Sequence, residues 1–301
     1  MISIFAPDGI GEVGDGSDLP AMIAEAVAGD PSGPLRDGDI VVVTSKIISK
    51  AEGRRLPAQQ REAAIAAEST GTVARRGAMR IVRTRQGLTI AAAGVDNSNV
   101  EPESILLLPA DPDASAAELR RALRSRYGLR VGVIISDTAG RAWRIGQTDH
   151  AIGASGVRVI DRYEGRIDPY GNDLQVTAIA VADELAAAAD LAKSKLAGRP
   201  VAVIRGLSTH LSDSSVDTAA SDLVRPAQED LFGRGAREAV LEATLAAYGQ
   251  ADRFEQVIDR PDAALATAVV DAVGAVGDRA ELIRAVIGAA VSGATHPAST
   301  R

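Results

Sequence analysis

Ile40-Val41-Val42-Val43-Thr44-Ser45-Lys46 is the stretch that decides the fold of this 301-residue chain. Its first five residues form an unbroken β-branched run, which is typical of a strand buried on both faces of a sheet. A second run of this kind, residues 131–136, ends at Asp137. Around the two runs, strand and helix patterns are mixed without strict alternation. The sequence therefore predicts an α+β (mixed α/β) fold with a mixed sheet.

The remaining elements follow from hydrophobic periodicity and from glycine and proline signals. Strands are predicted at residues 2–5, 157–160 and 201–205, and a hairpin at 80–84 and 88–92. Residues 140–156 read as a glycine-rich segment, and residues 208–221 as a mobile polar loop. Helices are predicted over residues 20–28, 58–78, 115–127, 177–197, 226–248, 261–274 and 278–291, before a frayed end.

The amino-acid composition excludes several classes of partner and of metal site. Lys and Arg total 33 against 40 Asp and Glu, a net charge of −7, which argues against nucleic acid as a partner. The chain has no cysteine and three histidines, so any metal should be a hard cation held by oxygen. No apolar run approaches the roughly 20 residues of a membrane span, and the first residues do not resemble a signal peptide. We expect a protein without a membrane partner, located in the cytoplasm.

Gly9-Ile10-Gly11-Glu12-Val13-Gly14 has the G-x-G-x-x-G spacing of dinucleotide-binding loops. A Rossmann site needs a helix that opens on these glycines and an acidic residue at the end of the next strand. Here residues 15–20 precede the helix, and the next strand runs into Ser45 and Lys46. A G-x-x-x-x-G-K-[ST] phosphate loop is absent from the sequence, so a P-loop NTPase is not expected. A loop that faces a phosphate or a ribose remains open, as does a nucleotide- or dinucleotide-binding oxidoreductase module.

Polar residues follow several predicted strands. Hydroxyls and ammonium groups at 44–50 suit a phosphate-rich ligand, or else mark a solvated strand exit. Asp96 lies in a polar turn, and Asp137-Thr138 ends a core strand. Two such carboxylates could share one divalent cation. Arg141 and Arg144 lie among glycines, as in loops that grip an anion, or as in an ordinary structural turn.

Several long motifs together resemble the coenzyme F420-0:γ-glutamyl ligase family from about residue 4 to residue 248. They occur in the order TSKIISKAEGR, AAAGVDNSNVEPESILLLP, VIISDTAGRAWRIGQTDHAIGASGV and DPYGNDLQVTAIAVADELAAAADLAKSKLAGRPVAVIRG. The resemblance implies a GTP-dependent ligase that adds L-glutamate to coenzyme F420-0 and then further γ-linked glutamates. It also implies Mn²⁺ or Mg²⁺, help from K⁺, and an intertwined homodimer whose family-specific fold has mixed and antiparallel sheets and is neither P-loop nor Rossmann.

The resemblance also assigns roles to single residues. Guanine nucleotide contacts are implied for Ile10, Gly11, Glu12, Val13, Ser45, Lys50 and Asn99, and metal contacts for Asp96, Asp137 and Thr138. A late loop within 214–222, with Asp217, is expected to add to both. Because water must be kept from the reaction, the loop 208–221 is expected to fold over the site. Lys50, Asp137 and Arg144 are the expected catalytic residues, with Lys46 and Arg141 adding positive charge.

The resemblance implies a ligase domain over residues 1–248, in one part or two. Residues 249–301 form a short helical extension, too short for the flavin-dependent reductase-like domain of some actinobacterial relatives. Two alternatives remain beside the ligase: the oxidoreductase module at Gly9–Gly14, and a paralogue that binds the cofactor without chemistry. The presence of Ser45, Lys50, Asp96 and Asp137 argues against the second alternative.

Overall fold

The computed structural model describes residues 1–98, 101, 103–214, 216 and 218–293. The chain divides into two compact units. Unit 1 comprises residues 1–64, 86–88 and 94–225, and unit 2 comprises residues 65–85, 89–93 and 226–301. Both units combine helices with mixed or antiparallel sheets, which confirms the predicted α+β class. Within the described part of the chain, the helices are too short or too polar to cross a membrane.

Unit 1 is built on a five-stranded sheet. Its strands lie in the order β1 (Ser3–Phe5), β14 (Val201–Arg205), β2 (Ile40–Thr44), β8 (Gly132–Arg141) and β9 (Arg144–Ser155). The central pair, β2 and β8, is parallel, with Ile40 opposite Gly132 and Thr44 opposite Ser136. The other three pairs are antiparallel. The predicted mixed sheet is therefore confirmed, and the two runs quoted from the sequence are its centre.

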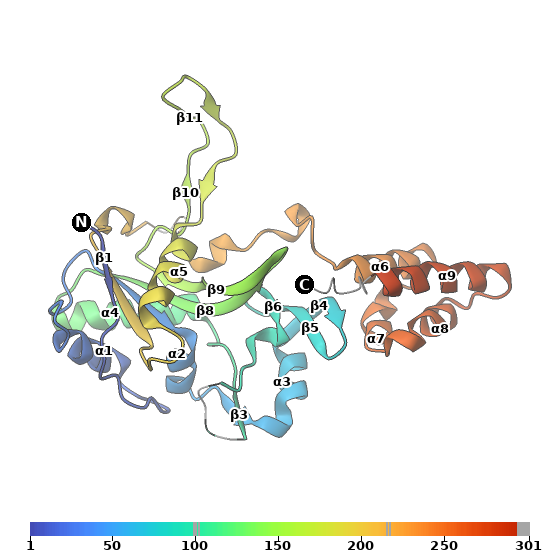
Figure 1. Cartoon of the computed structure of the whole chain (residues 1–301), viewed down its shortest axis with the longest axis horizontal. Helices are drawn as coiled ribbons and strands as arrows, with labels where there is room; N and C mark the ends of the chain where they lie inside the picture. Colours follow the sequence, from blue (N-terminus) through green and yellow to red (C-terminus); the bar gives the residue numbers. More distant parts are fainter. Residues whose placement is uncertain (99–100, 102, 215, 217, 294–301) are drawn as a thin grey trace, which may run out of the picture. The chain divides into compact units, whose positions relative to one another are not determined.

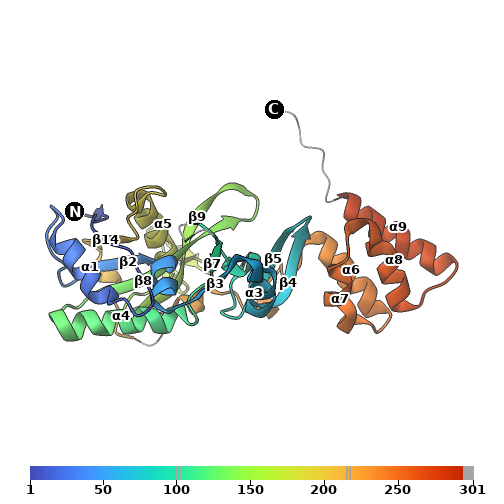
Figure 2. The same cartoon turned by 90° about the horizontal axis from the view of Figure 1, so that it is seen from below.

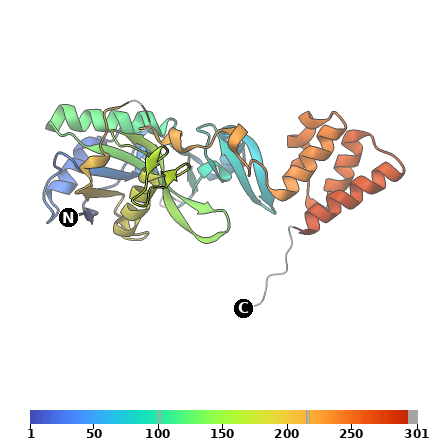
Figure 3. The ribbon, with the colours of Figure 1, turned by 90° about the horizontal axis from the view of Figure 1, so that it is seen from above.

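Helices cover both faces of this sheet. Helix α5 (Val181–Lys193) lies on one face, and α4 (Pro112–Tyr127) lies on the other beside α1 (Leu19–Ala28), as Figures 2 and 3 show. Ile40 and Val42 pack against the apolar side of α5. Because side chains alternate along a strand, Val41 and Val43 face the opposite layer. All four are fully buried, as the unbroken apolar run predicts.

The other elements of unit 1 are short, apart from an arm. Strand β3 (Arg55–Pro57) pairs with β7 (Ser104–Leu106), and α3 (Arg61–Glu68) leads into unit 2. In the arm, β10 (Asp161–Arg162) pairs with β13 (Ala178–Ile179), and β11 (Arg166–Ile167) with β12 (Asp173–Leu174); it projects from the rest of unit 1 (Figure 1). The remaining helical elements are α2 (Ser45–Ala51), η1 (Ala58–Gln60), η2 (Ala92–Gly94), η3 (Ser208–His210) and η4 (Ala220–Leu223).

Three segments differ from the prediction. The glycine-rich residues 140–156 contain the end of β8 and the whole of β9, because backbone pairing between the two strands outweighs the weak strand preference of glycine. Residues 157–160, predicted as a strand, follow β9 as irregular chain. The predicted helix 58–78 ends at Glu68, and residues 69–76 form β4, which pairs with a strand later in the chain. In the first and last of these segments, pairing between strands overrode local propensity.

Unit 2 combines a meander with a helical cluster. Strands β4 (Ser69–Arg76), β5 (Met79–Thr84) and β6 (Thr89–Ala91) pair in sequence, which confirms the predicted hairpin. The helices share a buried apolar core that includes Leu241, Ile258, Leu265 and Ile287. Their bounds are α6 (Ala236–Ala247), α7 (Phe254–Ile258), α8 (Asp262–Val273) and α9 (Asp278–Gly293), with η5 (Ala227–Glu229) and η6 (Ala251–Arg253) between them. Residues on both sides of position 248 thus belong to the same unit.

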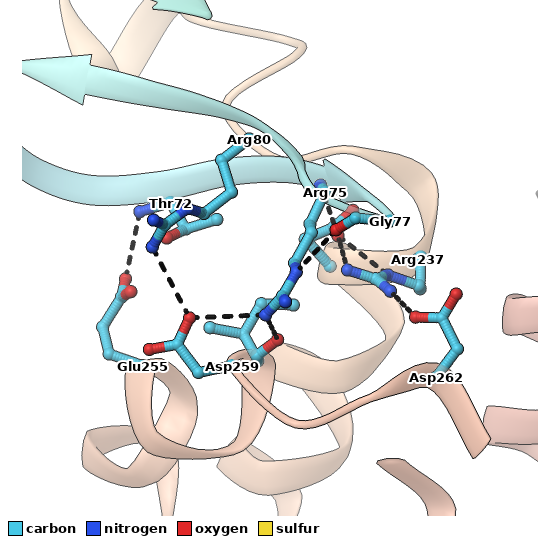
Figure 4. A network of polar contacts seen from close by, with 10 residues as sticks. Thr72, Arg75, Gly77, Arg80, Arg237, Glu255, Asp259 and Asp262 are labelled. Carbon is cyan, nitrogen blue, oxygen red and sulfur yellow. Dashed lines mark hydrogen bonds and ion pairs between the residues drawn. The ribbon is translucent and has the colours of Figure 1, made fainter. Parts of the chain in front are cut away.

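Polar contacts join the meander to the helices of unit 2 (Figure 4). The Thr72 backbone N–H donates to Glu255 across 3.2 Å, and the Arg75 guanidinium donates to the Ile258 carbonyl across 3.2 Å. Arg75 and Arg80 both face the Asp259 carboxylate. In this unit the buried side chain of Arg237 pairs with Glu238 at 2.6 Å, and also with Asp262.

Candidate functional site

A cavity of about 850 Å³ opens in unit 1 at the end of β2. This is the sheet edge at which the parallel strands β2 and β8 both deliver polar residues, the place where open α/β sheets gather ligands. Five parts of the chain contribute: a loop before α1, the junction of β2 with α2, the loop before β7, the strands β8 and β9, and the end of α5 with the segment after it. Their lining residues are Ile10, Gly11, Glu12, Val13, Thr44, Lys46, Ile47, Lys50, Glu101, Asp137, Thr138, Asp149, Asp190, Lys193, Ser194, Lys195, Leu196, Gly198, Arg199 and Pro200.

The glycine loop reaches this cavity without opening a helix. Residues 10–13 line it, while α1 begins at Leu19, where Asp18 caps the helix by accepting from the Ala21 N–H. Gly9 has φ +90°, a conformation that favours glycine. Glu12 turns toward the cavity wall and pairs with Lys50 at 2.6 Å, and this hydrogen bond holds the pKa of Glu12 below its usual value.

All four lysines of the chain line the same cavity. Lys46 and Lys50 are one helical turn apart on α2, so both lie on the same face of that helix. Lys193 ends α5, and Lys195 follows it. Together with Arg199 these lysines supply five basic side chains to the lining, which also holds the five acidic side chains of Glu12, Glu101, Asp137, Asp149 and Asp190. The sequence analysis selects the first two lysines and misses the other two, which lie 143–149 residues further along the chain.

Asp137 lies within hydrogen-bonding distance of the residue that follows β2. Its Oδ1 accepts a hydrogen bond from the Ser45 hydroxyl across 2.8 Å. Burial raises the pKa of Asp137 to about 6, and the nearby charges of Asp149 and Asp96 act in the same direction. The carboxylate is therefore held in surroundings that disfavour its negative charge until a cation offsets it.

Asp96 already has a cationic partner. Its Oδ2 lies 2.7 Å from the Lys46 ammonium. The Ser98 hydroxyl donates to the same oxygen and the Ser98 N–H to Oδ1, both across 2.8 Å. Burial opposes ionisation, but the hydrogen bonds from Lys46 and Ser98 outweigh it and keep the pKa of Asp96 below the ordinary value. Asp96 does not itself line the cavity; it is connected to the lining through Lys46.

Asp149, which the sequence reasoning did not select, is a third carboxylate at the site. It lies opposite Thr138 in the β8–β9 pair and accepts a hydrogen bond from the Thr138 hydroxyl across 2.7 Å. Lys193 lies 2.7 Å from its other oxygen. Burial acts to raise the pKa of Asp149, but the charge and hydrogen bond of Lys193 outweigh it, so the pKa is lowered. The rarity of lysine in this chain was the one sequence signal that pointed to this pair.

Other predicted residues lie elsewhere. Asn99 and Asp217 fall outside the described residues. Arg141 and Arg144 lie where β8 turns into β9 and do not line the cavity. Within the described part of 208–222, the loop is likewise absent from the lining: Asp113 of α4 accepts the N–H groups of Ala220 and Ser221. The segment 193–200 lines the cavity in its place.

The oxygen atoms at this site suit a hard cation that takes only a few of its ligands from the protein. Among the described residues, no three acidic, histidine or cysteine side chains converge into a metal-binding cluster. The half-buried Asp137 carboxylate and the Thr138 hydroxyl nevertheless both line the cavity and offer oxygen ligands. Mg²⁺ and similar ions often bind through one or two carboxylates together with substrate phosphates and water, so these residues fit such an ion.

Comparison with known proteins agrees with this geometry. A family model described as F420-0:Gamma-glutamyl ligase matches residues 9–206, which include every lining residue of the cavity. The chain is 39% identical over 241 residues to a "Coenzyme F420:L-glutamate ligase" of Methanopyrus kandleri, covering 73% of this chain and 93% of that protein. It is 36% identical to the Archaeoglobus fulgidus protein of that name, covering 77% of this chain and 97% of the relative. The protein belongs to the F420-0:γ-glutamyl ligase family.

Proposed function

We propose that this family member joins L-glutamate to coenzyme F420-0 at the expense of GTP, and then adds further γ-linked glutamates, in the cytoplasm. The observation that carries the proposal is the arrangement of charge in one cavity of unit 1. Four lysines line this cavity together with Asp137, a half-buried aspartate whose carboxylate accepts a hydrogen bond from a hydroxyl instead of a lysine. A site of this kind suits polyanionic substrates brought in with a divalent cation. The curated names of the relatives support the acceptor and the amino acid.

The cation is proposed to be Mn²⁺ or Mg²⁺, held by Asp137 and Thr138 with Asp96. When bound, it would neutralise phosphate charge during phosphoryl transfer. Burial of Asp137 supports this assignment, because a bound cation would offset the cost of its negative charge. Asp96 would join the ligands by exchanging its Lys46 partner. K⁺ is proposed as an additional activator, tested by replacing it with Na⁺ in the assay.

The nucleotide is proposed to lie along residues 10–13 with Ser45, Lys50 and Asn99. Backbone groups of the glycine loop and the α2 lysines border the same cavity, which is what a guanine nucleotide spanning base to triphosphate requires. Lys50 would leave Glu12 and turn to the phosphates, since its side chain is largely buried at the cavity wall while Glu12 is exposed. Arg144 is proposed to hold the acceptor or the glutamate, and Arg144→Ala should raise the KM for one of them.

The reaction needs two balanced steps. A carboxylate oxygen of the acceptor attacks the γ-phosphorus of GTP, the bond to the bridging oxygen breaks, and GDP leaves with an acyl phosphate formed. The glutamate amine then attacks the acyl carbon, the carbon–oxygen bond to phosphate breaks, and phosphate and a proton are released. Lysine ammonium groups would stabilise the charge on the transferring phosphoryl oxygens. Exclusion of water by bound substrates would limit hydrolysis of the acyl phosphate.

The test is a reconstituted assay read by mass spectrometry. The protein is incubated with GTP, Mn²⁺, L-glutamate and coenzyme F420-0, and successive additions of one glutamyl residue are expected with release of GDP. Parallel arms replace GTP with ATP, omit Mn²⁺, or use Asp137→Asn, and each should abolish the product or reduce it strongly. A calorimetric arm offers NAD(P) in place of GTP. Binding of NAD(P) without any glutamylation would overturn the proposal in favour of an oxidoreductase module.

A homodimer is proposed as the working assembly. Large apolar side chains are exposed on the two projecting hairpins of unit 1: Ile145 near the turn between β8 and β9, and Ile167, Tyr170 and Val176 on the arm. Such side chains on protruding strands often mark interaction sites, and a second copy of the chain would cover them on both partners at once.

A further inference from the structure

A closed network of polar side chains lies beside the cavity, where β8, β9 and α5 meet. Lys193 donates to Asp149 Oδ2 across 2.7 Å and to Ser136 Oγ across 2.8 Å. The Ser136 hydroxyl in turn donates to the same Asp149 oxygen across 2.8 Å. Ser136, Asp149 and Lys193 are all buried, with Lys193 and Asp149 each only 4% exposed. Two donors therefore fix Oδ2 of Asp149, which leaves Oδ1 aimed at one remaining partner.

That partner is Thr138, whose hydroxyl donates to Asp149 Oδ1 across 2.7 Å. A threonine hydroxyl has one proton to donate and two lone pairs that accept. Because its proton is committed to Asp149, only the lone pairs of Thr138 remain for the cavity that this residue lines. A hydroxyl held in this way already points its oxygen toward a cation. A freely rotating hydroxyl would lose rotational entropy on binding the same cation.

We propose that Asp149 is a positioning residue of this enzyme, which turns the Thr138 hydroxyl so that its oxygen faces the bound cation, and that Lys193 holds Asp149 in place. The inference rests on the proposed function, because it requires a divalent cation at Thr138. Lys193 is suited to the task because it is the last residue of α5, a helix anchored on the sheet by its apolar face. The network thus joins the cation ligand to the rigid core.

A structural ion pair would have a different signature from a positioning pair. A merely structural pair contributes to folding and is indifferent to whether Thr138 carries a hydroxyl. A positioning pair acts through that hydroxyl, so its effect disappears when the hydroxyl is removed. Partners behind a metal ligand typically change metal affinity by about 10- to 100-fold when mutated. The distinction can therefore be measured as a coupling between two substitutions.

The experiment is calorimetric titration of the full chain with Mn²⁺ in the presence of GTP. Asp149→Asn should weaken Mn²⁺ binding by about tenfold or more, because the amide turns its oxygen to Lys193 and offers its NH₂ to Thr138. Thr138→Val should weaken Mn²⁺ binding to a similar extent. In the double variant Asp149→Asn/Thr138→Val, the loss should equal that of Thr138→Val alone. Losses that multiply, or an unchanged affinity in Asp149→Asn, would overturn the inference.

Two further variants keep the result interpretable. Asp149→Leu/Lys193→Met removes the pair without leaving a buried charge, so it should fold even if Asp149→Asn does not, and it should show the same weakened binding. Asp39→Asn is the matched control: Asp39 is buried and pairs with Arg205 at 2.8 Å away from the cavity lining. It should lower the Tm and leave Mn²⁺ affinity unchanged.

The wild-type titration separates this inference from the proposed function. If the wild-type chain binds neither Mn²⁺ nor GTP, the proposed function and this inference both fail. If the wild-type chain binds both and the Asp149 variants bind Mn²⁺ equally well, only this inference is overturned.

Discussion

Ser45 Oγ donates a hydrogen bond to Asp137 Oδ1 across 2.8 Å, although 92 residues separate them in the chain. The parallel pairing of β2 with β8 brings them together: Thr44 lies opposite Ser136, so the next residue of each strand emerges at the same edge of the sheet. This contact fixes a half-buried carboxylate at the wall of the cavity. Much of the expected behaviour of the site follows from the burial of that one side chain.

Asp137 should make the metal-free protein less stable as pH rises. Its pKa is about 6 in the folded protein against an ordinary value of 3.8, so between these values the native state binds more protons than the unfolded chain. The free energy of unfolding therefore falls as pH increases through this window. Asp137→Asn lacks this effect, so its stability relative to wild type should rise by up to about 3 kcal/mol.

The measurement is urea unfolding of both proteins in a chelating buffer at a series of pH values from about 4 to 7, a window set by the raised pKa of Asp137. A difference between the two proteins that does not change with pH would contradict the assignment of a raised pKa. Saturating Mn²⁺ provides the internal control, because a ligand that binds only the native state stabilises it. Under those conditions the wild-type protein should become the more stable of the two.

The four lysines should report directly on ligand binding. Because all of them line the cavity, an amine-acylating reagent samples this site alone, apart from the chain terminus. Lys195 is exposed and should react fastest, and Lys193 is buried against Asp149 and should react slowest. GTP with Mn²⁺ should protect Lys50, as peptide mass spectrometry would show. Equal labelling of Lys50 with and without nucleotide would contradict the proposed phosphate contact.

Unit 2 should depend on the pair between Arg237 and Glu238. Both side chains are buried, so Arg237→Met leaves an unpaired buried carboxylate and should cost about 3–5 kcal/mol of unfolding free energy. Asp259→Asn is the control, since Asp259 is exposed and its pairs with Arg75 and Arg80 should contribute about 1 kcal/mol or less. Chemical denaturation of both variants measures the two losses of unfolding free energy. Equal losses would show that burial is not what makes the first pair important.

The proposed homodimer should be sensitive to the hairpin surfaces. Ile145→Ser together with Tyr170→Ser removes two large exposed side chains whose replacement leaves the core intact, so the monomer should remain folded. Sedimentation velocity should then show a shift from dimer toward monomer. Leu282→Ser, on the exposed side of α9, is the matched control and should leave the assembly unchanged. A variant that sediments like wild type would remove these surfaces from the interface.

Local pattern was a good guide where burial was complete. The apolar run of Ile40–Thr44 predicted a fully buried strand, and it is the centre of the sheet. It was a poor guide at 69–76 and 140–156, where strands form through partners elsewhere in the chain. Of the predicted site residues, Lys46, Lys50, Asp137 and Thr138 line the cavity, and the sequence predicts them because each follows an apolar β-branched run. It does not predict Asp149 and Lys193, because neither is at such a position.

The sequence by itself determined the central strands, the polar residues at their ends and the family, since these depend on residue type and order along short stretches. Only the tertiary structure decided which charges meet. Asp149 pairs with Lys193, and Asp96 pairs with Lys46. Strand pairing and helix packing bring these side chains together although they are 44 and 50 residues apart in the chain. Coulomb energy depends on distance and burial in space, and neither can be read from the order of residues along the chain.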